Sequence, residues 1–195
     1  MATKIWSNVQ VGMQSALGSA KTITGITKAN PAVATSTSHG LANGDIVVIT
    51  AQGMWQLDTR TVRVANVTTN TFELEGVDST SYDTFSSGSC QSVTFGTTFS
   101  TIGDMSVSGG DFEMIDITTI HDNTKKTIPG VSSAIEVSGN MNWDPNDLGQ
   151  IALKSASDAR ALRAFRVVFS DGSRWIFTGY PGFTGSPTGS AQQKV

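Results

Sequence analysis

The chain of 195 residues has little of what disulfides, metal sites and catalytic centres need. It contains one cysteine, Cys90, and two histidines, His39 and His121. One cysteine cannot form an intrachain disulfide, and this set is too small for a Cys/His metal cluster. We therefore expect no metal, no cofactor and a reducing compartment.

The same three residues lack the neighbours that a catalytic group requires. His39 lies in the sequence SHGL and His121 in HDN, which are typical of loop histidines. Cys90 lies in a linker rich in serine and glycine, without a basic residue that would lower the pKa of its thiol. Because no nucleophile stands beside a base, the sequence predicts no catalytic residue and no enzyme.

Charge is scarce as well, since 15% of residues are charged and the formal net charge is -3. A chain without a basic excess offers no surface that would hold a phosphate backbone, so we expect no tight DNA binding. No apolar run is long enough to cross a bilayer, and the opening residues MATKIWSNVQ do not resemble a signal peptide. We expect a soluble protein that is made in a cytoplasm.

Glycine, serine, threonine and short β-branched runs are abundant, which is typical of strands joined by tight turns. We predict a mainly β fold with one short helix, in three parts. Residues 1–20 form an arm that becomes ordered against a neighbour, residues 21–90 form a small β-barrel-like module, and residues 91–195 form a larger β-core.

Five short runs in the module predict strands, with turn signals such as Asn30-Pro31 between them. In the last run apolar and acidic residues alternate, as expected of a half-buried strand. The polar stretch 78–91 is predicted to close the module. The five runs are TITGITKA (22–29), AVATST (32–37), DIVVIT (45–50), TVRVANV (61–67) and TFELEG (71–76).

The core is predicted to contain a strand with one buried face, in SSAIEVSGNMNW (132–143), because apolar and polar residues alternate there. A helix is expected next, with Asp144 as its N-cap, and ending near residues 156–160. Its apolar stripe is Leu148, Ile151 and Ala152. Asp171-Gly172 between LRAFRVVF and RWIFTGY then predicts a β-hairpin.

Three acids, Asp111, Glu113 and Glu136, lie on predicted strands, where a charged side chain should point away from the core. The simplest interpretation is a solvated strand face. A functional interpretation requires a reason for that face to be acidic.

The run EMIDITTIHDNTKKTIPGVSSAIEVSGNMNWDPND (113–147) resembles the core of major tail tube proteins of long, flexible-tailed bacteriophages. The shared elements are the strand 115–119, Pro129-Gly130 before a long strand, and Asp-Pro-x-Asp before a helix. The hairpin SDGSRWIFTGY also fits, and together these elements cover about half of the chain. Residues 22–88 resemble a small β-module that recurs in phage structural proteins.

This resemblance implies a tail-tube-type β-sandwich whose inner sheet joins its neighbours in a ring, typically of six subunits, and rings that stack into a tube for DNA. The implied partners are other copies of the chain and the tape-measure, tail-tip and terminator proteins. Acids facing the lumen would repel DNA, which gives Asp111, Glu113 and Glu136 a role. Ring-stacking contacts are expected from Lys125, Lys126, Val9, Val11 and Met13.

Two related functions stay open. A tail-tip or fibre module could grip a host glycan or protein through exposed aromatics, for which Trp55, Tyr82 and Tyr180 are the candidates. A tail-terminator protein is the second alternative. In each case the protein is a structural part of the virion tail.

Overall fold

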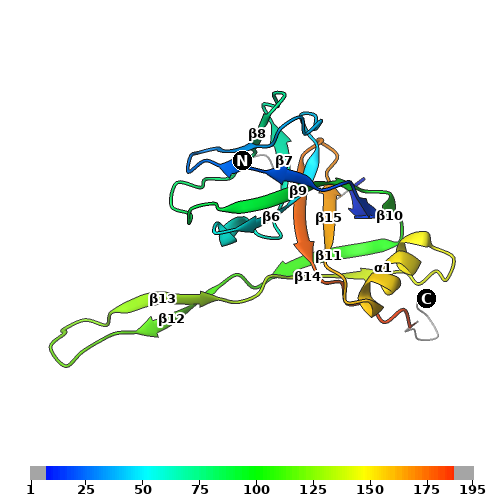
Figure 1. Cartoon of the computed structure of the whole chain (residues 1–195). Coiled ribbons are helices and arrows are strands. Elements are labelled where there is room, and N and C mark those ends of the chain that lie inside the picture. The colour runs from blue at the N-terminus through cyan, green and yellow to red at the C-terminus, as the bar shows by residue number, and fades with distance from the viewer. Residues whose placement is uncertain (1–7, 187–195) are drawn as a thin grey trace, which may run out of the picture. The chain divides into compact units, whose positions relative to one another are not determined.

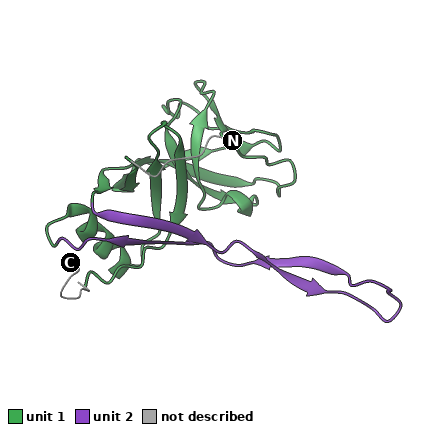
Figure 2. Ribbon diagram, turned by 180° about the vertical axis from the view of Figure 1, so that it is seen from behind, with its two compact units in different colours: residues 1–100, 145–186 green, residues 101–144, 187–195 purple. Residues whose placement is uncertain are grey.

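The computed structural model of the chain describes residues 8–186 and confirms the prediction of a mainly β fold (Figure 1). Strands take up 44% of these described residues and helical turns 8%, so the architecture rests on sheets. The chain divides into two compact units (Figure 2). Of the described residues, unit 1 comprises 8–100 and 145–186, and unit 2 comprises 101–144.

Most strands of unit 1 form an eight-stranded antiparallel sheet in the order β2-β9-β6-β7-β8-β5-β4, with β3 also paired to β9. Thr24 alone separates β3 from β4, and its N–H donates to Thr35 O. This stretch therefore joins β9 at one end of the order to β5 near the other, and the sheet curls. The strands are β2 (Ala16–Leu17), β3 (Lys21–Ile23), β4 (Gly25–Ile26), β5 (Ala32–Thr35), β6 (Ile46–Gln52), β7 (Thr61–Ala65), β8 (Thr71–Leu74) and β9 (Ser87–Thr94).

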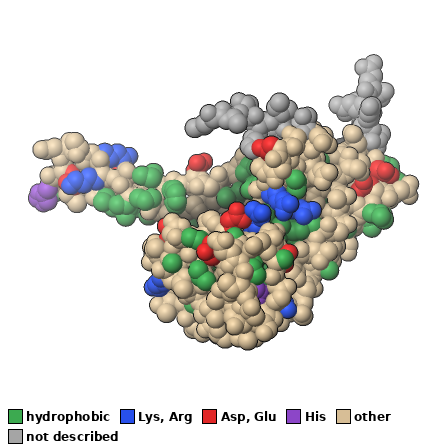
Figure 3. Space-filling view, turned by 90° about the horizontal axis from the view of Figure 1, so that it is seen from above, with side chains coloured by type: hydrophobic (Ala, Val, Ile, Leu, Met, Phe, Trp, Pro, Cys, Tyr) green, Lys and Arg blue, Asp and Glu red, His purple; other side chains and the backbone are tan. Residues whose placement is uncertain are grey.

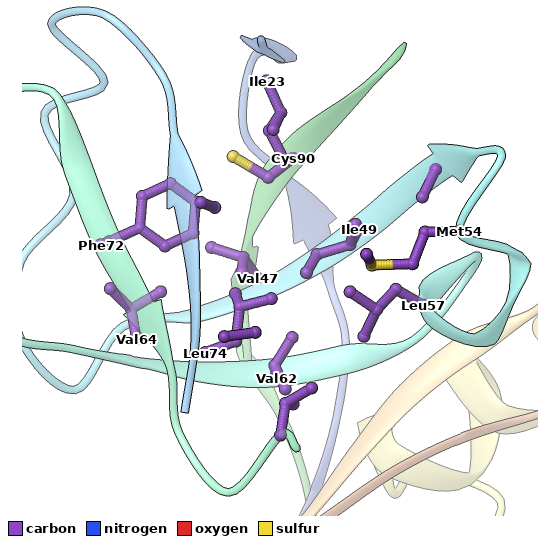
Figure 4. Packing of buried hydrophobic residues seen from close by; sticks show 14 of the residues in the cluster. Ile23, Val47, Ile49, Met54, Leu57, Val62, Val64, Phe72, Leu74 and Cys90 are labelled. Atoms are coloured by element: carbon purple, nitrogen blue, oxygen red, sulfur yellow. The ribbon is translucent and has the colours of Figure 1, made fainter. Parts of the chain in front are cut away.

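The curled sheet encloses the main hydrophobic core of unit 1 (Figure 4). Phe72 and Leu74 of β8 are fully buried there, beside Val47 and Ile49 of β6, which confirms the alternation expected of β8. Each such side chain stabilises the fold by roughly 1.5–3 kcal/mol. The short 3-10 helix η1 (Trp55–Leu57) adds Leu57 to this core and leaves Trp55 exposed.

Strand β9 was not expected, since its segment SGSCQSVT is polar and was predicted to lie in a closing linker. It instead pairs with β2, β3 and β6, and Cys90 is buried in the core. A Cβ at Gly88 would overlap the carbonyl oxygen of Thr50 on β6. A small residue is therefore needed where β9 lies close to β6. Because β9 has small and polar residues in place of large apolar ones, the sequence did not show it to be a buried strand.

A second sheet of unit 1 has four antiparallel strands in the order β10-β1-β15-β16. The hairpin predicted around Asp171-Gly172 is confirmed: Phe165 pairs with Phe177, and their stacked rings lie 5.3 Å apart between centroids. Gly172 has a φ of +80°, a conformation that glycine adopts without strain. The strands are β10 (Thr97–Phe99), β1 (Gln10–Met13), β15 (Arg163–Val168) and β16 (Arg174–Gly179).

Strand β1 lies inside this sheet, between β10 and β15, although residues 1–20 were predicted to form an arm. Val11 and Met13 are buried there and point to the same side of the sheet. Four residues give too short an alternation to be recognised in the sequence. The strand consequently ties the start of the described chain to β15, about 155 residues later in the sequence.

The predicted helix is present as α1 (Leu148–Asp158), but its N-cap is Asp147 and not Asp144. The Asp147 carboxylate accepts hydrogen bonds from Gln150 N and Ser100 Oγ. These bonds, with that from Ser100 the strongest influence, hold the pKa of Asp147 below its ordinary value. The cap thus satisfies an N–H of the first turn and ties α1 to the end of β10.

The buried face of α1 also differs from the predicted apolar stripe. Leu148 and Ile151 are exposed, whereas Gly149, Leu153 and Ala156 are buried. A Cβ at Gly149 would lie 2.6 Å from Thr98 O on β10, so only glycine allows this close approach. The helix therefore packs through Leu153 and the small residues Gly149 and Ala156, while Leu148 and Ile151 stay exposed.

Unit 2 contains the four remaining strands, which form two antiparallel pairs, β11 with β14 and β12 with β13. Together residues 101–144 make one extended two-stranded structure, which we call the long hairpin (Figure 2). We call the β11–β14 pair its proximal ribbon and the β12–β13 pair its distal ribbon. The strands are β11 (Ile102–Ser108), β12 (Phe112–Asp116), β13 (Thr127–Ser132) and β14 (Glu136–Met141).

Candidate assembly surface

The proximal ribbon of the long hairpin has one polar and one apolar face. Asp104, Ser106 and Ser108 on β11 stand opposite Asn140, Ser138 and Glu136 on β14. Residues that pair across strands share a face, so these six polar residues lie together. The hydroxyls of Ser106 and Ser138 lie 2.9 Å apart, and Asp104 accepts hydrogen bonds from Asn140 N and Nδ2.

The opposite face of the proximal ribbon pairs Val107 with Val137 and Ile102 with Met141. The sequence predicted this face to be buried, but Val107 is 52% exposed. Ile135, in line with Val137, is 68% exposed. The alternation was therefore correct, while the prediction of burial does not hold for the chain taken alone.

Apolar side chains remain exposed along the distal ribbon too, with charged side chains and a histidine near its tip (Figure 3). Many large apolar side chains left exposed on one element are typical of a protein–protein interface. The exposed residues of this ribbon and its loop are Phe112, Met114, Ile115, Ile117, Ile120, Ile128 and Val131.

A glycine joint separates the two ribbons. Gly109 and Gly110 both have φ values near the left-handed region, +83° and +84°. A Cβ at Gly109 would overlap the carbonyl oxygen of Ala134 on the opposite leg. Other residues are strained in this conformation, so the change of ribbon occurs where only glycine fits well.

The three predicted lumen acids are all exposed, but they divide between the two ribbons. Glu136 lies on the polar face of the proximal ribbon, opposite Ser108. Asp111 and Glu113 lie beyond the glycine joint, at the start of the distal ribbon. Their role at a lumen stays a prediction. Sequence reasoning missed Asp104, which shares the polar face of Glu136 and could be found only from the β11–β14 register.

The predicted stacking lysines lie at the tip of the long hairpin, where each meets an acid. Lys126 pairs with Asp122, and Lys125 Nζ lies 3.6 Å from Asp116 Oδ2. Lys126 lowers the pKa of Asp122, and hydrogen bonds from Thr118 lower that of Asp116. Both acids are therefore ionised at neutral pH, and these four charges cancel at the tip.

The apolar residues predicted to stack rings are placed differently. Val11 and Met13 are buried in β1, and Val9 is half-buried just before it. In the isolated chain their side chains contribute to unit 1 and offer little area to another subunit. Their stacking role stays a prediction.

The histidines and the cysteine are not brought together. His39 is buried, with its ring 5.1 Å from that of Phe72 and its Nδ1 accepting from Leu41 N. His121 is exposed at the hairpin tip, so only His121 has the exposed position expected of a loop histidine. Burial raises the pKa of the Cys90 thiol, which makes it a poor nucleophile. No group of three or more potential metal ligands occurs between residues 8 and 186.

A protein-family model for phage tail tube proteins matches residues 52–194 of the chain. The match covers more than half of the sequence, including both ribbons and α1. The chain belongs to the phage tail tube protein family. A comparison with curated proteins gives no match.

Membership of the tail tube family confirms the resemblance recognised in the sequence and identifies a structural protein of the phage virion tail. Tail tube proteins assemble with copies of themselves and with other tail proteins. The exposed apolar side chains of the long hairpin are therefore expected to contact other subunits. Within residues 8–186, no helix has the length and apolar character needed to cross a membrane.

Proposed function

We propose that this tail tube protein forms rings of six subunits that stack into the tube through which phage DNA enters the host. It would be made in the bacterial cytoplasm and join the tape-measure, tail-tip and terminator proteins. The two-faced proximal ribbon carries this proposal. The wall of a tube needs a polar face toward the solvated lumen and an apolar face that packs against protein. This ribbon has both kinds of face.

Ring closure also explains why the two strands of the proximal ribbon each have an edge without a pairing partner. Within the described residues, β11 pairs only with β14, so each strand has one edge without a partner. An unpaired edge offers its N–H and C=O groups to another strand. Pairing with the ribbons of neighbouring subunits, repeated around a ring, removes all of these edges.

We propose that the polar face of the proximal ribbon lines the lumen. It carries Glu136 and Asp104 among small hydroxyl and amide side chains. Acids repel phosphate and cannot release its counterions, so DNA would slide past without binding. Asp111 and Glu113 would extend this acidic lining if the distal ribbon also faces the lumen.

Electron microscopy of the purified protein at rising concentration tests ring and tube formation. Wild type should give rings or hollow tubes of uniform diameter. Val137→Glu puts a charge on the apolar face and should prevent assembly, whereas the matched control Ser138→Glu puts the same charge on the polar face and should leave it intact. Normal tubes from Val137→Glu would exclude this arrangement.

The lumen is tested separately, in assembled virions. Replacing Glu136, Asp111 and Glu113 together by lysine should slow DNA ejection, because the wall would then attract phosphate. Unchanged ejection from tails of normal length would show that these acids do not face the DNA.

One observation favours a second role, for the small module of unit 1. Trp55 is 70% exposed on η1, and Gln56 beside it donates a hydrogen bond to Asp83. Exposed indole rings can stack on sugars. Titration of host-surface glycans against wild type and Trp55→Ala, followed by tryptophan fluorescence, would detect such binding.

A further inference from the structure

Charge is distributed unevenly over this chain. Residues 101–144 hold seven acids and two lysines, a formal charge of -5, whereas the remaining residues hold nine acids and eleven Lys or Arg, a charge of +2. The net value of -3 therefore conceals an acidic long hairpin and a basic remainder. Opposite charges on two parts of a self-assembling protein favour contacts between unlike parts of neighbouring copies.

Three of the eleven basic residues outside the long hairpin line one cleft within unit 1, between β7 and β16. Three arginines line it, Arg60, Arg63 and Arg174, with Glu75 the one acid among the lining residues. The two strands meet where Thr61 and Thr178 place their hydroxyls 2.6 Å apart. We call this feature the arginine cleft.

The arginines of the cleft are not fully neutralised within the chain. Arg63 forms an ion pair with Glu75 at 3.0 Å, and Arg60 donates to Tyr82 OH. The side chain of Arg174 forms no hydrogen bond or ion pair with any of residues 8–186. A guanidinium left exposed beside others is available to a carboxylate, which it can hold through two parallel N–H donors.

A fourth guanidinium adds to the positive potential. Arg166 lies on the same face of the β15–β16 hairpin as Arg174, packs over the ring of Phe95, and has a buried Nε without a described acceptor. Burial lowers the pKa of Arg166, and the nearby Arg174 lowers it further. Such crowding of like charges is unfavourable until an anion arrives.

The acidic side of the contrast contains two carboxylates in a suitable arrangement. Asp111 and Glu113 are exposed, and neither side chain forms a hydrogen bond or ion pair with the described residues. They are two positions apart, Asp111 just before β12 and Glu113 within it, where the β12–β13 register shifts, so about 7 Å of chain separates them. The other strand acids of the distal ribbon and its tip, Asp116 and Asp122, are already paired with lysines.

We propose that the arginine cleft of one subunit binds the carboxylates of Asp111 and Glu113 from the long hairpin of a second copy. The contact is head-to-tail, since cleft and carboxylates lie on different parts of the chain, and it can repeat without limit. It rests on the self-assembly proposed above, and it gives these two acids a role other than lining the lumen.

Charge reversal in the full-length protein tests the contact. Arg174→Glu and Glu113→Arg should each raise the concentration for half-maximal assembly by about tenfold or more, because like charges then meet. The double variant, which restores an unlike pair with its polarity reversed, should return to within about threefold of wild type. Light scattering and electron microscopy give both readouts.

Lys28→Glu is the matched control, because Lys28 is exposed on unit 1 and outside the cleft, and the change in charge is identical. Thermal melting verifies that each variant is folded. Assembly of wild type and of all variants at equal concentrations would overturn the cleft contact while leaving tube formation intact. A wild type that never assembles would overturn both. Slowed DNA ejection by Glu113→Arg with normal assembly would assign Glu113 to the lumen instead.

Discussion

The two units differ in the burial of their apolar side chains. Every buried hydrophobic residue of the described chain lies in unit 1, where the curled sheet and the four-stranded sheet enclose them. The long hairpin buries none, although it is rich in isoleucine, valine and methionine. Unit 1 thus has the features of a self-sufficient fold, whereas the hairpin leaves its apolar side chains for the contacts with other subunits that we propose. Stability and assembly should therefore respond to different substitutions.

The largest effect is expected from the core of unit 1. Phe72→Ala removes a fully buried ring and should lower the free energy of unfolding by about 3–5 kcal/mol. Urea unfolding followed by circular dichroism measures this loss. A loss below about 1 kcal/mol would show that the core tolerates a cavity there, and would weaken the contrast between the units.

The helix cap comes next. Asp147→Ala removes the acceptor for Gln150 N and Ser100 Oγ, and should cost about 1 kcal/mol in the free energy of unfolding. The same urea titration measures it. Asp144→Ala is the control, since the sequence placed the cap there; a larger loss at Asp144 than at Asp147 would contradict the observed cap.

The cap should also depend on pH in a defined direction. The folded pKa of Asp147 is lowered, so its contribution is fully present above the unfolded value of about 3.9 and is lost as the pH falls through the folded value. The difference in stability between wild type and Asp147→Asn should therefore shrink between about pH 5 and the folded pKa. A difference that stays constant down to pH 2 would show that ionisation of Asp147 is unimportant.

A smaller effect on stability, with a larger one on assembly, is expected in the long hairpin. Phe112 is 61% exposed, so Phe112→Ala should change the monomer's free energy of unfolding by less than about 0.5 kcal/mol. Tube formation should require more protein, because an apolar anchor is lost at the interface. Unfolding and light-scattering measurements on the same variant separate the two effects. A destabilised monomer would mean that Phe112 already packs within the single chain.

The smallest effect is expected at the tip. Lys126→Ala breaks an exposed ion pair with Asp122 and should change the free energy of unfolding by about 0–0.5 kcal/mol. If the tip bridges rings as predicted, the same substitution should make assembly more sensitive to salt. Light scattering at two salt concentrations, with Lys28→Ala as a control, distinguishes these outcomes.

Local signals in the sequence predicted most of the strands and the turn between β15 and β16, because Asp171-Gly172 and the flanking aromatics act within a few residues. The alternation of β14 likewise predicted which residues share a face. What failed depended on distant neighbours. Gly88 and Gly149 are small because Thr50 and Thr98 approach them, and this proximity cannot be read from adjacent residues.

The candidate site was less predictable than the fold, for a related reason. Alternation reveals an apolar face but not what covers it, so Val137 and Ile135 were assigned to a core, whereas in the single chain Val137 is half-buried and Ile135 is exposed. The same limit applies to charge. Glu136 and Asp104 come to lie on one face through a register between strands more than 30 residues apart. Arg63 and Arg174 come to line one cleft from two different sheets.

The glycine joint of the long hairpin has a consequence for how such a protein can evolve. Gly109 leaves no space for another side chain, so this position has little freedom to change. The ribbons on either side have separate pairing registers and share no strand pair. Substitutions that alter the contacts of the distal ribbon need not disturb the proximal ribbon. With the proximal ribbon at the lumen, as we propose, a tail could acquire new neighbours while its channel stays the same.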